Sequence, residues 1–483
     1  MLPKNLRYGS KVESAPAKSY RSNIQPQNGT GPYNLGDTII FNIPTRSNLV
    51  LCPSDSYLKW TVQSFTTAAA NSLRWDKCGS HGLIQRIRVY HGSNLLQDLD
   101  VYGNLTKILF DLQCETDATY NKLNILCGTR NDLVVTTNAV AAVGAGLAVP
   151  AVPVTYLSAQ QINSGEGIPK ANGNVVLAAN DTTTAITYCL NLVSIVGSLC
   201  PNNYLPLFAM TAAPLRVEIQ LISQDYYGLC EVAATTHAAG VVTNVEYIAS
   251  MIELGDQSMQ MIESSLEGRP LQFVYGDYRN YQYTYALPSP ATTQVSFPIP
   301  AKFSSLKSIF LSQRDKGTGA LGYFPFSSVT YGLYSYYWRI GPQIIPSKPP
   351  DDIVSFYSEL LKSVGVISDL QFNPSIRKTN YLISSSTANT TALEANTASN
   401  TNSGSVYVGI DLENFTGASK DSIFAGWNSN TDDIYFVGNY NTANGSATNY
   451  TGADLAAATI RFDAYAMYDC VFICENGTAY VKY

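Results

Sequence analysis

Apolar and polar residues alternate in short runs along most of the chain, and this pattern predicts a protein built mainly of β-strands. The clearest run covers residues 214–222, where Leu215, Val217, Ile219 and Leu221 alternate with polar neighbours and are expected to point inward. Each half of the chain holds roughly eight such runs, a number typical of a β-sandwich or jelly roll. Further strands are predicted at residues 38–44, 56–63, 83–90, 185–193, 205–210, 245–254, 271–275, 281–285, 294–300, 306–312, 331–340, 406–412, 434–438, 458–468 and 471–474.

Two stretches far apart in the chain share one plan of a strand, a glycine turn and an amphipathic helix. They cover residues 88–112 and 339–361, and the turns contain Gly92 and Gly341. A unit repeated once in each half indicates two similarly built domains in tandem. The expected helix N-caps are Asp100 and Asp351, the expected stop of the second helix is Gly365, and the apolar stripes are Leu105, Ile108, Leu109 and Leu112, then Ile353, Phe356, Tyr357, Leu360 and Leu361.

Composition divides the chain into four parts. With 483 residues, the chain is too long for one ordinary core and suits two. Residues 1–33 lack apolar periodicity and are predicted to form a basic N-terminal arm, which either contacts nucleic acid, a membrane face or an acidic neighbour, or is a solvated tail. Its cations are Lys4, Arg7, Lys11, Lys18 and Arg21. The remaining parts are a first domain at 34–254 with a loop excursion at 129–182, a connecting helix at 255–269 with Asp256 as cap and Met259, Ile262 and Leu266 inward, and a second domain at 270–483 with an excursion at 384–404.

The overall composition narrows the possible functions. Charged residues make up only 14% of the chain while tyrosine occurs 33 times, which suits wide buried or protein-covered β-surfaces. The net charge of −6 does not support a globally basic surface for nucleic acid. Nine cysteines at irregular spacing, without a Cys-x-x-Cys pair, are expected to be buried free thiols in a reducing compartment. The N-terminus shows no apolar signal segment, so synthesis in the cytosol is expected.

A search for catalytic and metal-binding motifs is mostly negative. The three histidines, His81, His91 and His237, are not spaced as metal ligands on a helix, and neither a nucleophile elbow nor a phosphate-binding loop occurs. Asp432 and Asp433, with Asn428 and Asn430, fit an Asn/Asp turn better than a Ca²⁺ loop. We therefore expect no catalytic, cofactor-binding or metal site, although a cleft with two carboxylates, as in a glycosidase, stays open.

Four segments carry a resemblance to a known family: Asn34–Arg46, Ser56–Trp60, Val89–Leu96, and Leu205–Phe208 continuing to Leu215–Leu221. They resemble the first half of a double jelly-roll major capsid protein of icosahedral DNA viruses, of the lineage of virophages, Polinton-like elements and adenoviruses. The resemblance covers most of residues 34–365 and is vaguer beyond. It implies an all-β fold of two tandem eight-stranded jelly rolls with short helices and long inter-strand loops.

The same resemblance implies a structural role in a virion. Three copies would form a homotrimeric, pseudo-hexameric capsomer that tiles an icosahedral shell, with the excursions at 129–182 and 384–404 as outer towers. Neighbouring capsomers, penton proteins and minor capsid proteins would be its partners, and the arm would face the shell interior, the genome or an internal membrane. The host receptor is unknown.

Two other function classes fit parts of the pattern. A two-domain β-sandwich adhesin or glycan-binding protein would use the abundant Tyr and Trp to stack on sugars, and it could work as a monomer. A β-rich hydrolase would need the paired carboxylates. Oligomeric state separates the adhesin from the capsid protein, because a capsomer protein must associate with copies of itself.

Overall fold

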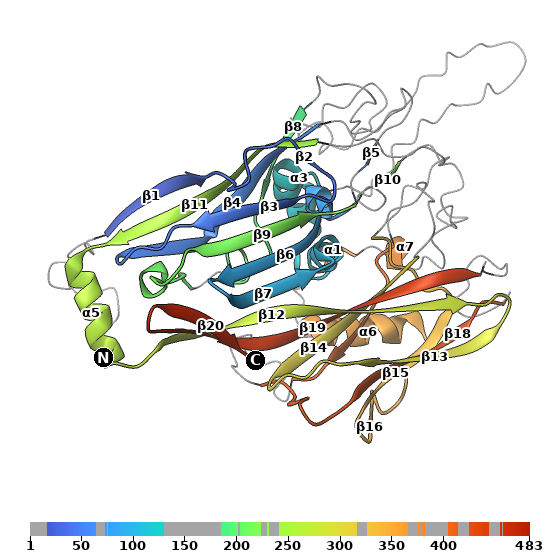
Figure 1. Ribbon diagram of the computed structural model, residues 1–483. Coiled ribbons are helices and arrows are strands. Elements are labelled where there is room, and N and C mark those ends of the chain that lie inside the picture. Colours follow the sequence, from blue (N-terminus) through green and yellow to red (C-terminus); the bar gives the residue numbers. More distant parts are fainter. Residues whose placement is uncertain are drawn as a thin grey trace, which may run out of the picture.

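The computed structural model describes residues 17–63, 73–74, 76–129, 185–200, 203–223, 229–230, 241–315, 326–365, 374–376, 378–381, 404–413, 425–443, 455 and 457–483. They form two β-sandwiches side by side, linked at one end by the helix α5 (Figure 1). The first sandwich, roll 1, contains β1 (Ala17–Ile24), β2 (Tyr33–Asn34), β3 (Thr38–Ile43), β4 (Leu49–Gln63), β5 (Leu73–Arg74), β6 (Ile84–His91), β7 (Asn94–Asp100), β8 (Ala185–Leu190), β9 (Leu215–Leu221), β10 (Leu229–Cys230) and β11 (Val241–Leu254). The second, roll 2, contains β12 (Leu271–Leu287), β13 (Thr292–Ile299), β14 (Leu306–Asp315), β15 (Leu333–Ile340), β16 (Gln343–Ile345), β17 (Tyr407–Asp411), β18 (Ile434–Asn441), β19 (Ala458–Glu475) and β20 (Thr478–Lys482).

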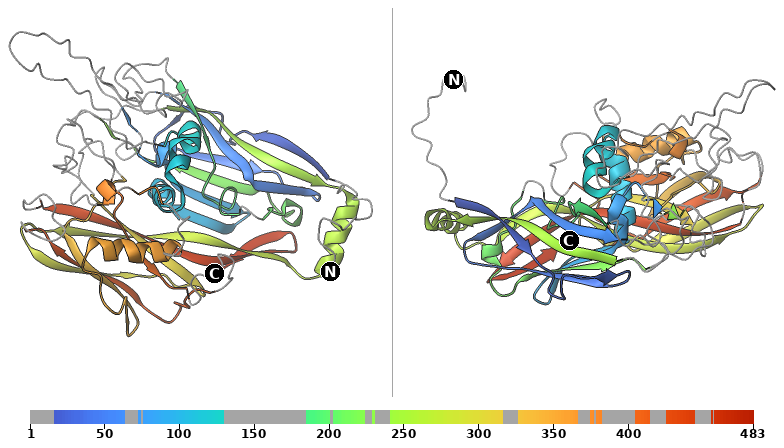
Figure 2. Two further views of the ribbon diagram at one scale, coloured as in Figure 1. Left: turned by 180° about the vertical axis from the view of Figure 1, so that it is seen from behind. Right: turned by 90° about the horizontal axis from the view of Figure 1, so that it is seen from above.

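Short helices accompany the strands. They are α1 (Tyr102–Gln113), α2 (Thr116–Tyr120), α3 (Lys122–Cys127), α5 (Asp256–Leu266), α6 (Ile353–Val364) and α7 (Lys378–Tyr381), with 3₁₀ turns at Gly79–Leu83 and Leu207–Ala209. Seen from above, α1 to α3 of roll 1 and α6 of roll 2 lie on the same side of the molecule (Figure 2). Among the described residues, no helix is both long and apolar enough to span a membrane.

The two rolls have the same strand order. In roll 1 the sheets run β1-β11-β4-β8 and β3-β9-β6-β7, and in roll 2 they run β12-β19-β14-β17 and β13-β18-β15-β16. When the eight main strands of each roll are counted in chain order, both give 1-8-3-6 in one sheet and 2-7-4-5 in the other. Within these four sheets the described strands pair antiparallel, and this order is that of a jelly roll. The predicted fold of two tandem eight-stranded jelly rolls is confirmed.

The strands form because one face of each is buried. In β9 the predicted inward residues Leu215, Val217, Ile219 and Leu221 are all buried, and the intervening residues are partly exposed. Roll 2 has an aromatic core, in which Trp338 packs edge-on against Phe436 with ring centroids 5.1 Å apart. The sandwich interiors thus follow the alternation visible in the sequence.

The repeated strand, turn and helix unit is present in both rolls. It comprises β6, β7 and α1 in roll 1 and β15, β16 and α6 in roll 2, with Gly92 and Gly341 at positive φ in the turns. Gly365 ends α6 as predicted.

Both predicted N-caps of these helices are wrong. Asp100 is the last residue of β7, and the cap of α1 is Val101 in the left-handed region, because the strand runs directly into the helix. In α6 the cap is Asp352 rather than Asp351, and its carboxylate accepts hydrogen bonds from the amides of Val354 and Ser355, both at 2.8 Å.

Several other boundaries differ from the prediction. Residues 17–24, expected in the arm, form the edge strand β1, because their amides and carbonyls pair with β11. Residues 205–210 contain a 3₁₀ turn instead of a strand. The runs at 271–275 and 281–285 belong to one strand, β12, and those at 458–468 and 471–474 to β19. The connecting helix is present, but Met259, Ile262 and Leu266 are not buried, because α5 stands apart from both cores (Figure 1). Both predicted excursions fall outside the described residues except at residues 129 and 404.

Candidate assembly surface

Roll 1 contacts roll 2 through the β6–β7 hairpin, which lies against β12 and β20, and through α1, which lies beside α6 (Figure 1). The side-chain amide of Asn94 donates to the carbonyl of Ala479 at 3.0 Å. The backbone amide of Ala479 donates to Nδ1 of His91 at 3.0 Å, so Nε2 of this imidazole carries the proton and donates to the carbonyl of Ala213. His91, for which the sequence indicated no role, therefore orients the contact between the rolls.

A second contact buries a carboxylate. Asp277 of β12 is 2% exposed and accepts a hydrogen bond from the side-chain amide of Gln97 of β7 at 2.7 Å. Gln97 is itself held by Ser194 and the amide of Ile195, which donate to its Oε1 at 2.6 and 3.0 Å. Burial raises the pKa of Asp277 to about 6, because the charged form loses its hydration. This contact is therefore sensitive to pH.

A third contact is a fully buried charge network centred on Lys107 of α1. Its ammonium donates to the carbonyl of Gly404 at 2.5 Å and to the hydroxyl of Tyr407 at 2.9 Å, both in roll 2. The Tyr407 hydroxyl donates to Asp111 at 2.7 Å, and Lys77 forms an ion pair with Asp111 at 3.0 Å. Burial alone would raise the pKa of Asp111, but Lys77 and Lys107 outweigh it and hold this pKa below its ordinary value.

These contacts make the two rolls one unit. Lys107 and Asp111 have no exposed surface, and a buried charge that loses its partner is strongly destabilising. Separating the rolls would break the hydrogen bonds of Lys107 to Gly404 and Tyr407. We conclude that the rolls hold a fixed relative orientation.

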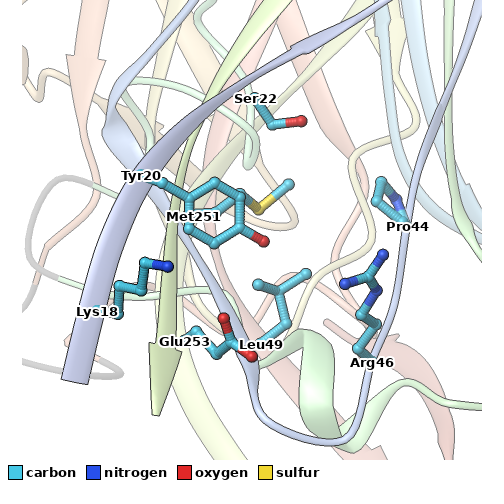
Figure 3. Close-up of a pocket in the computed structure, with 8 residues that line it drawn as sticks. All are labelled: Lys18, Tyr20, Ser22, Pro44, Arg46, Leu49, Met251 and Glu253. Atoms are coloured by element: carbon cyan, nitrogen blue, oxygen red, sulfur yellow. The ribbon is translucent and has the colours of Figure 1, made fainter. Parts of the chain in front are cut away.

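The free edge of roll 1 carries a pocket of about 390 Å³ (Figure 3). Leu49 and Met251 form its buried apolar floor, while Lys18 and Arg46 are exposed at its rim. Its lining comes from β1 (Lys18, Tyr20, Ser22), the turn after β3 and the start of β4 (Pro44, Arg46, Leu49), and β11 (Met251, Glu253).

The predicted arm residues have different places. Lys18 lines the pocket, and Arg21 is exposed on the opposite face of β1. Lys4, Arg7 and Lys11 lie outside the described residues. The structure thus brings one of the five predicted cations to a defined surface feature.

The acidic turn of roll 2 uses its carboxylates within the fold. Asp432 accepts a hydrogen bond from the indole of Trp427 at 2.9 Å, and Asp433 forms an ion pair with Lys302 at 2.9 Å. Within the described ranges, no cluster of three or more His, Cys, Asp or Glu side chains has the arrangement of a metal site. Six cysteines are buried free thiols: Cys52, Cys78, Cys127, Cys200, Cys470 and Cys474.

Comparison with solved structures places this architecture. The chain is similar to VP54 of the virus PBCV-1 as fitted into the virophage Sputnik, with a TM-score of 0.60 and 10% identity over 99% of both chains. It is also similar to the major capsid proteins of Faustovirus (TM-score 0.55, 9% identity, 97% and 92% covered) and of mavirus (TM-score 0.52, 11% identity, 100% and 93% covered). The fold is that of the double jelly-roll major capsid proteins. No protein-family model and no curated protein sequence matches the chain.

Sequence reasoning missed the residues that join the halves of this double jelly roll. Lys107 and Asp111 are four residues apart on α1, and this spacing is equally typical of an ion pair on the solvated face of a helix. Gln97 and Asp277 are 180 positions apart. One available signal was the position of Lys107, which lies between the predicted apolar positions Leu105 and Ile108 on α1.

Proposed function

We propose that this chain is the major capsid protein of an icosahedral virus, and that three copies associate into a capsomer with six jelly rolls. The observation that carries the proposal is the rigid tandem arrangement of two jelly rolls with identical strand order. Three copies of a two-roll unit supply six similar wedges around one axis, which suits hexagonal tiling. The likeness to capsid proteins over almost the whole chain supports the same role.

Within this proposal, the protein is a structural component of the virion and its principal partner is itself. Neighbouring capsomers, penton proteins and minor capsid proteins would complete the shell. The basic N-terminal arm, with Lys4, Arg7 and Lys11, would face the shell interior and contact the genome or an internal membrane.

Electron microscopy of the purified protein tests the proposal. Six-lobed particles with threefold symmetry, or closed shells, are expected. Two-lobed particles at every protein concentration would instead favour a monomeric two-domain adhesin, which a glycan-binding array would then test.

A further inference from the structure

The equivalent helices of the two rolls differ in burial. Both α1 and α6 have 12 residues and follow the fifth strand of their roll, but ten residues of α1 are buried against three of α6. Roll 2 supplies part of the cover of α1, through Gly404 and Tyr407 at Lys107. On α6, Val354 is 71% exposed. The outer side of α6 therefore lacks the cover that its counterpart receives from another roll.

The equivalent edge strands show the same difference. Lys18 of β1 corresponds to Asp277 of β12. Lys18 lies opposite the β11 residue that pairs with Leu49, the first residue of the third strand of roll 1. Asp277 lies opposite the β19 residue that pairs with Leu306, the first residue of the third strand of roll 2. Asp277 is 2% exposed beneath Gln97 of roll 1, whereas no residue of β1 is buried. The edge of roll 1 that corresponds to the covered edge of roll 2 is thus free.

The fifth strands complete the correspondence. Leu95 of β7 corresponds to Ile344 of β16, and Gln97 corresponds to Ile345. The β6 residues that pair with Leu95 and Gln97 occupy the same places in their sheet as Arg339 and Trp338 of β15, which pair with Ile344 and Ile345. β7 lies against roll 2, while β16 lies on the side of roll 2 away from roll 1 (Figure 1). Gln97 of β7 is 2% exposed, whereas its counterpart Ile345 of β16 is only partly buried. Roll 2 consequently presents, unpartnered, the edge that roll 1 uses to bind roll 2.

We propose that the β16–α6 edge of roll 2 in one copy binds the β1 edge of roll 1 in a second copy, as the β7–α1 edge binds the β12 edge within each chain. The inference rests on the proposed trimeric capsomer and names the surfaces that hold it together. Such a contact is head-to-tail, because it joins two different surfaces. Head-to-tail contacts generate a closed ring when the rotation between units permits it.

The pocket on roll 1 lies where this contact would form. In roll 2 the corresponding corner, between the first strand, the eighth strand and the turn joining the second and third, is filled by aromatic rings. Phe303 stacks on Tyr468 with centroids 3.8 Å apart, and Tyr483 packs against both. In roll 1 the corner is open (Figure 3).

The corners of roll 1 and roll 2 differ in polarity, and so do the fifth-strand residues that would contact them. Within the chain, polar Gln97 meets the Asp277 carboxylate. The counterpart of Gln97 is the apolar Ile345, and the counterpart of Asp277 is Lys18, which lies at the rim of a pocket with Leu49 and Met251 at its floor. The aliphatic stem of Lys18 and the floor of Leu49 and Met251 offer apolar contact to Ile345, which favours a second copy as the occupant of this pocket.

Two single substitutions test the contact from its two sides, with mass measured by light scattering. Ile344→Asp places a charge on the exposed β16 edge, and Ser22→Trp fills the pocket. Each substitution is expected to convert the trimer to a monomer. The melting temperature of the monomeric fold should stay unchanged. Ile125→Asp is the matched control, because Ile125 on α3 is 54% exposed and lies on neither edge; this variant should remain a trimer.

Mixing the two defective variants distinguishes a head-to-tail contact from other arrangements and shows that both are folded. One intact contact remains between the β16 edge of the Ser22→Trp chain and the β1 edge of the Ile344→Asp chain, so the mixture should give dimers of about 105 kDa, twice the chain mass of 52.5 kDa. Trimers formed by both variants alone would overturn this inference and leave the proposed function intact. A wild-type protein that is monomeric at every concentration would overturn both.

Discussion

Substitution of Lys107 by methionine tests whether the buried network determines how strongly the two rolls hold together. Methionine keeps most of the side-chain volume and removes the ammonium, so that the effect reports the lost polar contacts rather than a cavity. The substitution leaves the carbonyl of Gly404 and the hydroxyl of Tyr407 without this donor, at sites with no solvent. Asp111 retains Lys77 at 3.0 Å as a partner.

The expected loss follows from these contacts. Removing one member of a buried charge pair costs about 3–5 kcal/mol, and the remaining Lys77 places this case near the lower figure, about 3 kcal/mol. For a folding unit of the size of one roll, that loss corresponds to a decrease in melting temperature of roughly 6–12 °C.

Urea unfolding followed by tryptophan fluorescence measures this change, because Trp60 in roll 1 and Trp338 in roll 2 are both fully buried. Lys122→Met is the control, since Lys122 is exposed at the start of α3, and its effect should stay within about 0.5 kcal/mol. A double-mutant cycle with Tyr407→Phe should give a coupling energy of roughly 0.5–3 kcal/mol. If Lys107→Met changes the free energy of unfolding by less than about 1 kcal/mol, the network does not hold the rolls together.

Three further predictions concern pH, packing and thiols. Because the pKa of Asp277 is raised to about 6, its carboxyl group binds a proton more tightly in the folded state than in the unfolded state. The protonated carboxyl group contributes about 3 kcal/mol to the free energy of unfolding. This contribution is complete below about pH 4 and is lost as the pH rises through 6. Asp277→Asn should therefore raise the melting temperature at pH 8 and not at pH 4, and an equal shift at both would refute the assignment. A Cβ on Gly103 would lie 2.8 Å from the Phe326 ring, so Gly103→Ala should destabilise the protein by about 1–3 kcal/mol in thermal unfolding. Gly276→Ala should have little effect, because its Cβ would meet only the flexible end of Met467 at 3.3 Å. Similar values for the two variants would show that the contact between Gly103 and Phe326 is loosely packed. Burial raises the pKa values of Cys127, Cys200 and Cys474 to about 12, so peptide mapping should find them alkylated at pH 8 only in denaturant, and labelling of the native protein would contradict their burial.

The sequence predicted the fold best where burial on one face leaves a visible alternation. In β9 every second residue is apolar, and the repeated glycine turns Gly92 and Gly341 marked the same hairpin in both rolls. It failed at β1, whose residues are polar and mostly exposed, because an edge strand is held by backbone pairing and needs no apolar face.

The assembly surface was less accessible to sequence reasoning. Lys107 and Asp277 are charged residues that a sequence assigns to solvent by default, and only the docking of one roll on the other buries them. The free edges were invisible for a related reason. Val354 lies outside the apolar stripe predicted for α6, and only comparison of this helix with its covered counterpart α1 shows that cover from another roll is missing.

The solution mass of the purified wild-type protein, measured by light scattering over a range of concentrations, tests the capsomer most directly. The chain mass is 52.5 kDa, and a particle three times that mass, about 158 kDa, or a larger closed shell is expected. A stable species of 52.5 kDa at high concentration would contradict the proposed capsomer.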